Sequence, residues 1–153
     1  MTTPETRTPG IRPAPGRHPE WRAQAPVVTV VAVGGALGAV GRYALTLAWP
    51  TPPGSFPWAT FWTNVSGCAA MGVLMVLVTE VWAAHRLLRP FLGTGVLGGF
   101  TTFSTYAVDV RALADAGRPG TALVCLAATL CAALAAVWLA SAAARLVFTR
   151  RQR

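Results

Sequence analysis

The sequence predicts an all-α membrane protein with four transmembrane helices, on the basis of its composition and its spacing of charges. Hydrophobic residues make up 54% of the 153 residues and charged residues only 12%, about half of the charged share in soluble domains. The charges leave long uncharged runs, of 19, 37, 19 and 26 residues, which begin after Arg22, Arg42, Arg89 and Arg118. A helix needs about 20 apolar residues to cross a bilayer. The run of 37 is too long for one crossing, so it divides between two helices around a proline-rich turn.

The elements follow in order from these runs. Residues 1–25, rich in Pro, Thr and Arg, cannot bury a core and predict a disordered basic tail. Residues 26–148 form a four-helix domain, with helices expected at about 27–48, 59–82, 88–110 and 121–148, and residues 149–153 form a second basic tail. In the first helix, Gly34 and Gly38 have the GxxxG spacing that lets another helix approach closely.

The arginines predict how the chain lies in the membrane. Ten of them fall in the N-terminal tail, the connection between the second and third helices, and the C-terminal end, whereas three lie toward the other side. Because positive charge favours the cytoplasmic side, both termini are expected in the cytoplasm. The net charge of +8 therefore reflects membrane topology, and no nucleic-acid partner is expected.

The third helix carries an unusual polar stretch at its centre, GGFTTFSTY over residues 98–106. Two glycines followed by threonines are poor material for a continuous helix. A break near the bilayer midplane frees backbone carbonyls, so it must be buried in protein or line a site. The alternative is an unbroken helix with a tight glycine crossing and threonines bonded to their own turn.

This stretch resembles the GGxTTFSTF signature of the Fluc/CrcB fluoride channel family. Two other segments agree with the resemblance: GAVGRY at residues 38–43 is similar to the family's GAxGRY, and FPWATFWTNVSG at residues 56–67 is similar to its FPxGTLxxNxxG. The resemblance covers about Val27 to Leu146. It implies an antiparallel dimer with two fluoride pores in the bacterial inner membrane, surrounded by lipid.

The resemblance also implies roles for particular residues. A structural sodium ion would be held by the backbone carbonyls of Gly98 and Thr101, with no organic cofactor. Arg42 would lie at a vestibule mouth, where its charge raises the local anion concentration. The pore and its fluoride sites would be lined by aromatic edges, an amide and hydroxyls, from Asn64, Phe103, Ser104, Thr105, Tyr106 and Thr129.

The sequence departs from the family pattern at several of these positions. Tyr106 stands where a second phenylalanine is usual, Ala59 replaces a glycine, and Asp109 replaces a glutamate. In the fourth helix, Cys125 and Thr129 align with a tyrosine and a serine. These changes keep open a second interpretation, in which the chain is a structural partner subunit with a degenerate pore.

The sequence also bears on two other functions, a multidrug exporter and an enzyme, and on the type of dimer. A small multidrug exporter needs a carboxylate within the membrane, but Glu80 and Asp109 lie at helix ends. An enzyme is not expected, because the sequence shows no nucleophile–base pair or metal-ligand cluster. The arginine bias of ten against three predicts insertion in one orientation. An antiparallel dimer would then require a related but different chain of opposite orientation, with a tolerant homodimer as the alternative.

Overall fold

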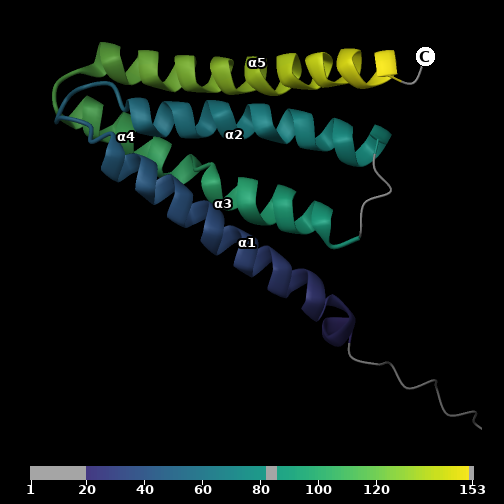
Figure 1. The fold of residues 1–153 in the computed structure, drawn as a ribbon. Coiled ribbons are helices and arrows are strands. Elements are labelled where there is room, and N and C mark those ends of the chain that lie inside the picture. Colours follow the sequence, from purple (N-terminus) through teal and green to yellow (C-terminus); the bar gives the residue numbers. More distant parts are fainter. Residues whose placement is uncertain (1–19, 82–85, 152–153) are drawn as a thin grey trace, which may run out of the picture.

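The computed structural model describes residues 20–81 and 86–151, and all regular secondary structure within these ranges is helical. Figure 1 shows α5 running alongside α2, and α1 running alongside η2 and α3, while α4 leaves the break to pack against α5. The elements in chain order are α1 (Glu20–Ala48), α2 (Trp58–Val76), the π-helices η1 (Leu77–Val81) and η2 (Pro90–Leu97), α3 (Gly98–Phe100), α4 (Phe103–Asp115) and α5 (Pro119–Arg151).

Three helices of the described part are long and apolar enough to cross a membrane: Gln24–Ala48, Trp58–Thr79 and Pro119–Phe148. The fourth expected span is not one continuous helix. The chain is helical from Pro90 to Phe100, is extended at Thr101 and Thr102, and becomes helical again at Phe103. The structure therefore shows the break that the sequence predicts, and it lies at the two threonines. The preceding glycines, Gly98 and Gly99, are helical.

The observed helices extend beyond the expected ones at several ends. Helix α1 begins at Glu20, so residues 20–25 of the expected tail are helical. Helix α4 continues to Asp115, and α5 runs from Pro119 to Arg151, into the second expected tail. Charged residues mark where an apolar span ends, but a helix can continue into the polar region around it. The rest of the expected tails, residues 1–19 and 152–153, lies outside the described residues.

Helix α1 crosses η2 and α3 at very close range through glycines on both sides. Gly34 and Gly38 are buried, and a Cβ atom on Gly34 would lie 2.6 Å from the Phe91 carbonyl oxygen. A Cβ on Gly95 would lie 3.0 Å from the Cα of Gly34, and a Cβ on Gly99 would overlap the Gly35 carbonyl. The close packing predicted from the GxxxG spacing is confirmed.

The helix ends lie at two opposite ends of the molecule, and the helices are splayed apart at one of them (Figure 1). The start of α1, the end of η1, the start of η2 and the end of α5 lie at one end, and the connections 49–57 and 116–118 lie at the other (Figure 1). Six of the nine arginines in the described residues, Arg22, Arg86, Arg89, Arg145, Arg150 and Arg151, therefore share one end, and the arginines of residues 1–19 and 152–153 lie outside the described part.

Candidate functional site

The break in the third helix is held open by Asn64 of α2. Thr101 has φ −74° and ψ 155°, and Thr102 has φ −148° and ψ 125°, both extended. The Thr102 N–H donates to Asn64 Oδ1 at 2.8 Å, and Asn64 Nδ2 donates to the Thr102 carbonyl at 3.0 Å. One amide therefore satisfies both backbone groups of a residue that has left the helix, in a region where unpaired backbone groups are costly.

The second half of the helix begins with a threonine cap. The Thr102 hydroxyl oxygen accepts from the Thr105 N–H at 3.1 Å, and it also lies 3.1 Å from Thr105 Oγ1 and 3.3 Å from Ser104 Oγ. Such a side-chain cap satisfies one of the free N–H groups at a helix start. Ser104 and Thr105, which the resemblance places on the polar track, therefore lie in a hydroxyl cluster at the start of α4.

The first half of the helix ends in carbonyl groups. Thr101 donates from both its N–H and its Oγ1 to the Leu97 carbonyl, each at 3.0 Å. The Thr102 N–H would bond the Gly98 carbonyl in a continued helix, but it bonds Asn64 instead. The break thus releases carbonyls at the positions expected to hold sodium, Gly98 and Thr101. Backbone oxygens at the C-terminal end of a half-helix suit a hard cation, so this donor set fits the expected ion.

A groove of about 240 Å³ lies against the break, between α2, α4 and α5. Phe103 is 81% exposed there, and its ring centroid lies 5.8 Å from that of Tyr106, at an interplanar angle of 57°. Asn64 and Thr129 are buried polar residues of its wall. The groove therefore combines aromatic rings with amide and hydroxyl groups, and its lining is Asn64, Cys68, Thr101, Thr102, Phe103, Tyr106, Thr129, Leu130 and Ala133.

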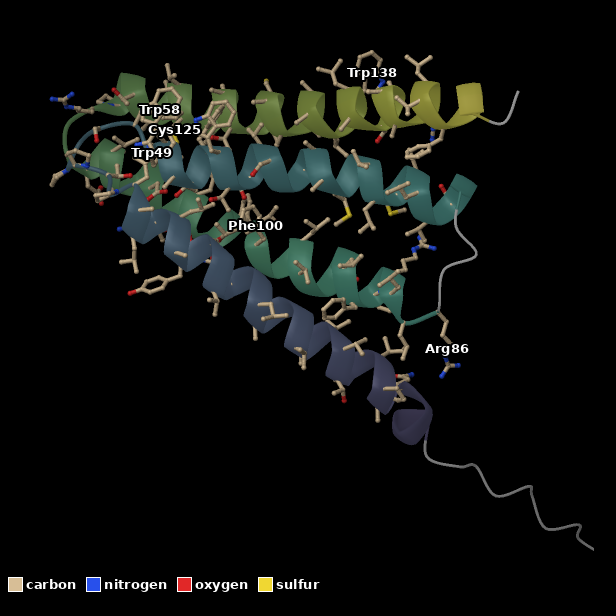
Figure 2. All side chains as sticks on the ribbon, in the orientation of Figure 1. Trp49, Trp58, Arg86, Phe100, Cys125 and Trp138 are labelled. Atoms are coloured by element: carbon tan, nitrogen blue, oxygen red, sulfur yellow. The ribbon has the colours of Figure 1, made fainter. Side chains whose placement is uncertain are left out.

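Tyr106 also ties α4 to α5. Its hydroxyl donates to the Leu126 carbonyl at 2.7 Å, and its ring packs against a small core of Leu113, Ala122 and the fully buried Cys125. Figure 2 shows Cys125 at the end of α5 that lies near α2 and α4. The residue that departs from the family pattern thus uses its additional hydroxyl in a bond between helices.

Two further contacts were not indicated by the sequence. Phe100 lies between α1 and α2 (Figure 2), where its ring would contact a Cβ at Gly41 and at Gly67. Arg42 does not line the groove; its Nε donates to the Gly99 carbonyl at 3.3 Å. Neither contact has a sequence signal apart from the small residues that permit close approach, because both depend on which faces of the helices meet.

Asp109 takes part in a second polar contact, nearer the end of the molecule that carries the 49–57 connection. Thr60 Oγ1 donates to Asp109 Oδ2 at 2.7 Å. The carboxylate also lines a smaller cavity of about 170 Å³ beneath the proline-rich turn. Asp109, whose side chain is shorter than the glutamate usual at this position in the family, is therefore hydrogen-bonded to α2.

The long apolar helices, together with a mostly apolar groove that carries a few amide and hydroxyl groups at a broken helix, define a multi-pass helical membrane protein with a candidate ion path. The family model described as "CrcB-like protein, Camphor Resistance (CrcB)" matches residues 29–141. The chain belongs to this family.

Curated relatives match over most of the chain. A protein of Streptomyces coelicolor named "Fluoride-specific ion channel FluC 1" is 63% identical over 153 residues, 99% of each chain. A protein of Streptomyces avermitilis named "Fluoride-specific ion channel FluC 2" is 61% identical over 135 residues, 85% of each chain. One of Nocardia farcinica with the same name is 58% identical over 119 residues, 78% of this chain and 85% of its own.

Proposed function

We propose that this chain is a subunit of a fluoride-selective channel that lets cytoplasmic fluoride leave a bacterial cell passively. The observation that carries the proposal is the groove at the helix break, where the exposed ring of Phe103 lies beside the buried amide of Asn64. The names of the relatives support fluoride as the ion. The channel lies in the inner membrane with both termini in the cytoplasm, as the arginine bias favours.

The groove offers an anion several weak contacts and no fixed positive charge among its lining residues. Aromatic rings carry a positive edge, which Phe103 and Tyr106 present from neighbouring turns of α4. Asn64 has two amide N–H groups and uses one of them on Thr102, so the other is available to fluoride. Thr129 contributes a hydroxyl group to the same lining. Conduction requires binding of this kind, which is adequate but not strong.

Passive flow is sufficient for export. Hydrogen fluoride crosses membranes as a neutral acid and ionises in the more alkaline cytoplasm, where fluoride is trapped. A negative interior drives the anion outward with about 2.3 kcal/mol per 100 mV. No organic cofactor is required by this mechanism. A sodium ion on the carbonyls of Gly98 and Thr101 would supply a positive charge that stabilises the C-terminal end of the half-helix.

A second subunit completes the pathway in this proposal. The ring of Phe103 is 81% exposed on the single chain, and an antiparallel partner would cover it. The arginine bias favours a related but different partner chain. Two relatives from Streptomyces avermitilis have the names FluC 2 and FluC 3, which supports the existence of paired paralogues in related organisms.

A structural partner subunit is the second candidate function. It is favoured by the bond of Tyr106 to Leu126, which commits the hydroxyl of a pore residue to a contact between helices. In this case the partner chain supplies the working pore, and the groove of this chain supports it without conducting.

Replacing Phe103 distinguishes the two candidate functions, a conducting subunit and a structural partner subunit. Phe103→Ile removes the aromatic edge and keeps an apolar side chain, so it should lower fluoride efflux from liposomes at least about tenfold if the ring contributes the ~1.4 kcal/mol of an aromatic contact. Val108→Ile, at another exposed position of α4, is the matched control and should leave the efflux unchanged. Efflux that survives Phe103→Ile, with this chain alone or with a partner, would favour the structural role.

A further inference from the structure

Arg42 reaches the break from a different helix. It lies on α1, and its Nε donates to the carbonyl of Gly99, 57 residues away, at 3.3 Å. The glycines before it bring the two elements together: a Cβ on Gly38 would lie 2.7 Å from the Phe100 nitrogen, and Gly41 faces the Phe100 ring. The guanidinium is therefore held at the C-terminal end of α3 by the packing of α1.

The Gly99 carbonyl needs such a donor. In a continuous helix it would accept from the N–H of Phe103, but Thr101 and Thr102 are extended and Phe103 starts a new helix. An unpaired carbonyl at membrane depth is costly. The Nε–H of Arg42 supplies the missing donor.

We propose that Arg42 is a positioning residue that fixes the end of the first half-helix, and so the register of Thr101, Thr102 and Phe103, through its Nε–H. This inference rests on the proposed function, because the register matters for transport only if the groove conducts. It differs from the role that the resemblance implies, a charge that attracts anions to a vestibule. In the positioning role the essential feature is an N–H donor at one atom, and in the vestibule role it is the charge.

Three substitutions separate the donor from the charge. Arg42→Gln places an amide nitrogen after three side-chain carbons, at the same position along the chain as Arg Nε, and removes the charge. Arg42→Lys keeps the charge but places a carbon at that position and the ammonium one bond further. Arg42→Met removes both and places a methyl group there.

The measurements are fluoride efflux from liposomes and the melting temperature of the purified protein. If Arg42 positions the break, the Gln variant should keep efflux within about threefold of the parent, whereas the Met variant should lose about tenfold or more, because the part-buried Gly99 carbonyl then has no side-chain donor. The Lys variant should resemble Met. The melting temperatures should follow the same order, with Gln above Lys and Met.

The opposite order would overturn the inference. If Lys behaves like the parent and Gln like Met, and if the efflux of the parent falls with ionic strength while that of Gln does not, Arg42 acts as an attracting charge. Equal efflux and equal melting in all variants would also overturn it. If the parent conducts no fluoride, the proposed function fails, and the melting order still decides whether Arg42 holds the break. A Gln variant that fails to fold while Lys folds counts against the donor role.

Discussion

At the scale of single residues, the phenol of Tyr106 has two separable parts. Its ring lies in the groove beside Phe103, and its hydroxyl donates to Leu126 on α5 at 2.7 Å. Tyr106→Phe should therefore destabilise the protein by about 0.6 kcal/mol, a typical value for a hydrogen bond between membrane helices, and should keep fluoride efflux because the ring edge remains. The measurements are reversible unfolding in detergent and liposome efflux. Loss of most efflux in the Phe variant would show that the hydroxyl contacts the ion.

Asn64 joins two functions in one amide, since it pairs both backbone groups of Thr102 and faces the groove. Asn64→Leu should destabilise the protein by about 1–3 kcal/mol, because it leaves the part-buried N–H and carbonyl of Thr102 unpaired, and it should abolish efflux. Thr63→Val is a suitable control: Thr63 is 1% exposed, and its hydroxyl donates to the Ala59 carbonyl of its own helix.

The two variants of α2 should be compared by melting temperature and efflux in the same preparation. An Asn64→Leu variant as stable as the parent would contradict the role of Asn64 at the break. A loss in the Thr63 variant equal to that in the Asn64 variant would mean that α2 simply tolerates no change in this region.

At the scale of the element, the crossing of α1 over η2 and α3 depends on particular glycines. A Cβ on Gly38 would overlap the Val96 carbonyl and lie 2.7 Å from the Phe100 nitrogen, whereas a Cβ on Gly35 meets nothing within 4 Å. Gly38→Ala should therefore destabilise the protein by about 1–3 kcal/mol, the usual cost of overpacking. Gly35→Ala, on the same helix, should be neutral. The melting temperatures of the two variants test this difference in stability, and equal values would contradict the observed crossing.

The location of these elements is predictable where a local pattern sets it. The uncharged runs predict the spans, the spacing of Gly34 and Gly38 predicts a close crossing, and the polar stretch of residues 98–106 predicts the break. The residue at which the helix breaks is not predictable in this way. Gly98 and Gly99 are the weaker helix formers, but Gly99 is required for the approach to Gly35 and stays helical.

The contacts within the site are less predictable from the sequence than the positions of the helices, because they depend on tertiary structure to a greater extent. The family resemblance implies that Asn64 and the polar residues of the third helix share a pore, and the structure brings Asn64, Phe103, Tyr106 and Thr129 to one groove. The sequence does not predict the bonds of Arg42 to Gly99 and of Tyr106 to Leu126. Each bond depends on which faces of two distant helices meet, and the spacing of residues within one segment does not predict this.

At the scale of the whole molecule, positive charge is distributed unequally between the two ends. Among the described residues, the end that holds the start of α1, the start of η2 and the end of α5 has six of the nine arginines. At the other end, Arg118 lies against Gly54 of the proline-rich turn, and Arg111 pairs with Asp115 at 3.5 Å on the surface. An exposed pair of this kind contributes little to stability.

This asymmetry predicts one orientation in the membrane, and with it the nature of the partner. Positive charge near short connections is retained on the cytoplasmic side, and discounting Arg7 and Arg12 as remote from α1 still leaves eight arginines against three. The chain should therefore insert with both termini inside, so an antiparallel dimer requires a different chain with the opposite bias. Reporter fusions at the C-terminus should give signal from the cytoplasmic side alone. Adding arginines to the 49–57 and 116–118 connections until the two sides balance should produce signal from both sides. Equal signal from both sides in the unaltered chain would instead establish a homodimer whose packing overrides its charge.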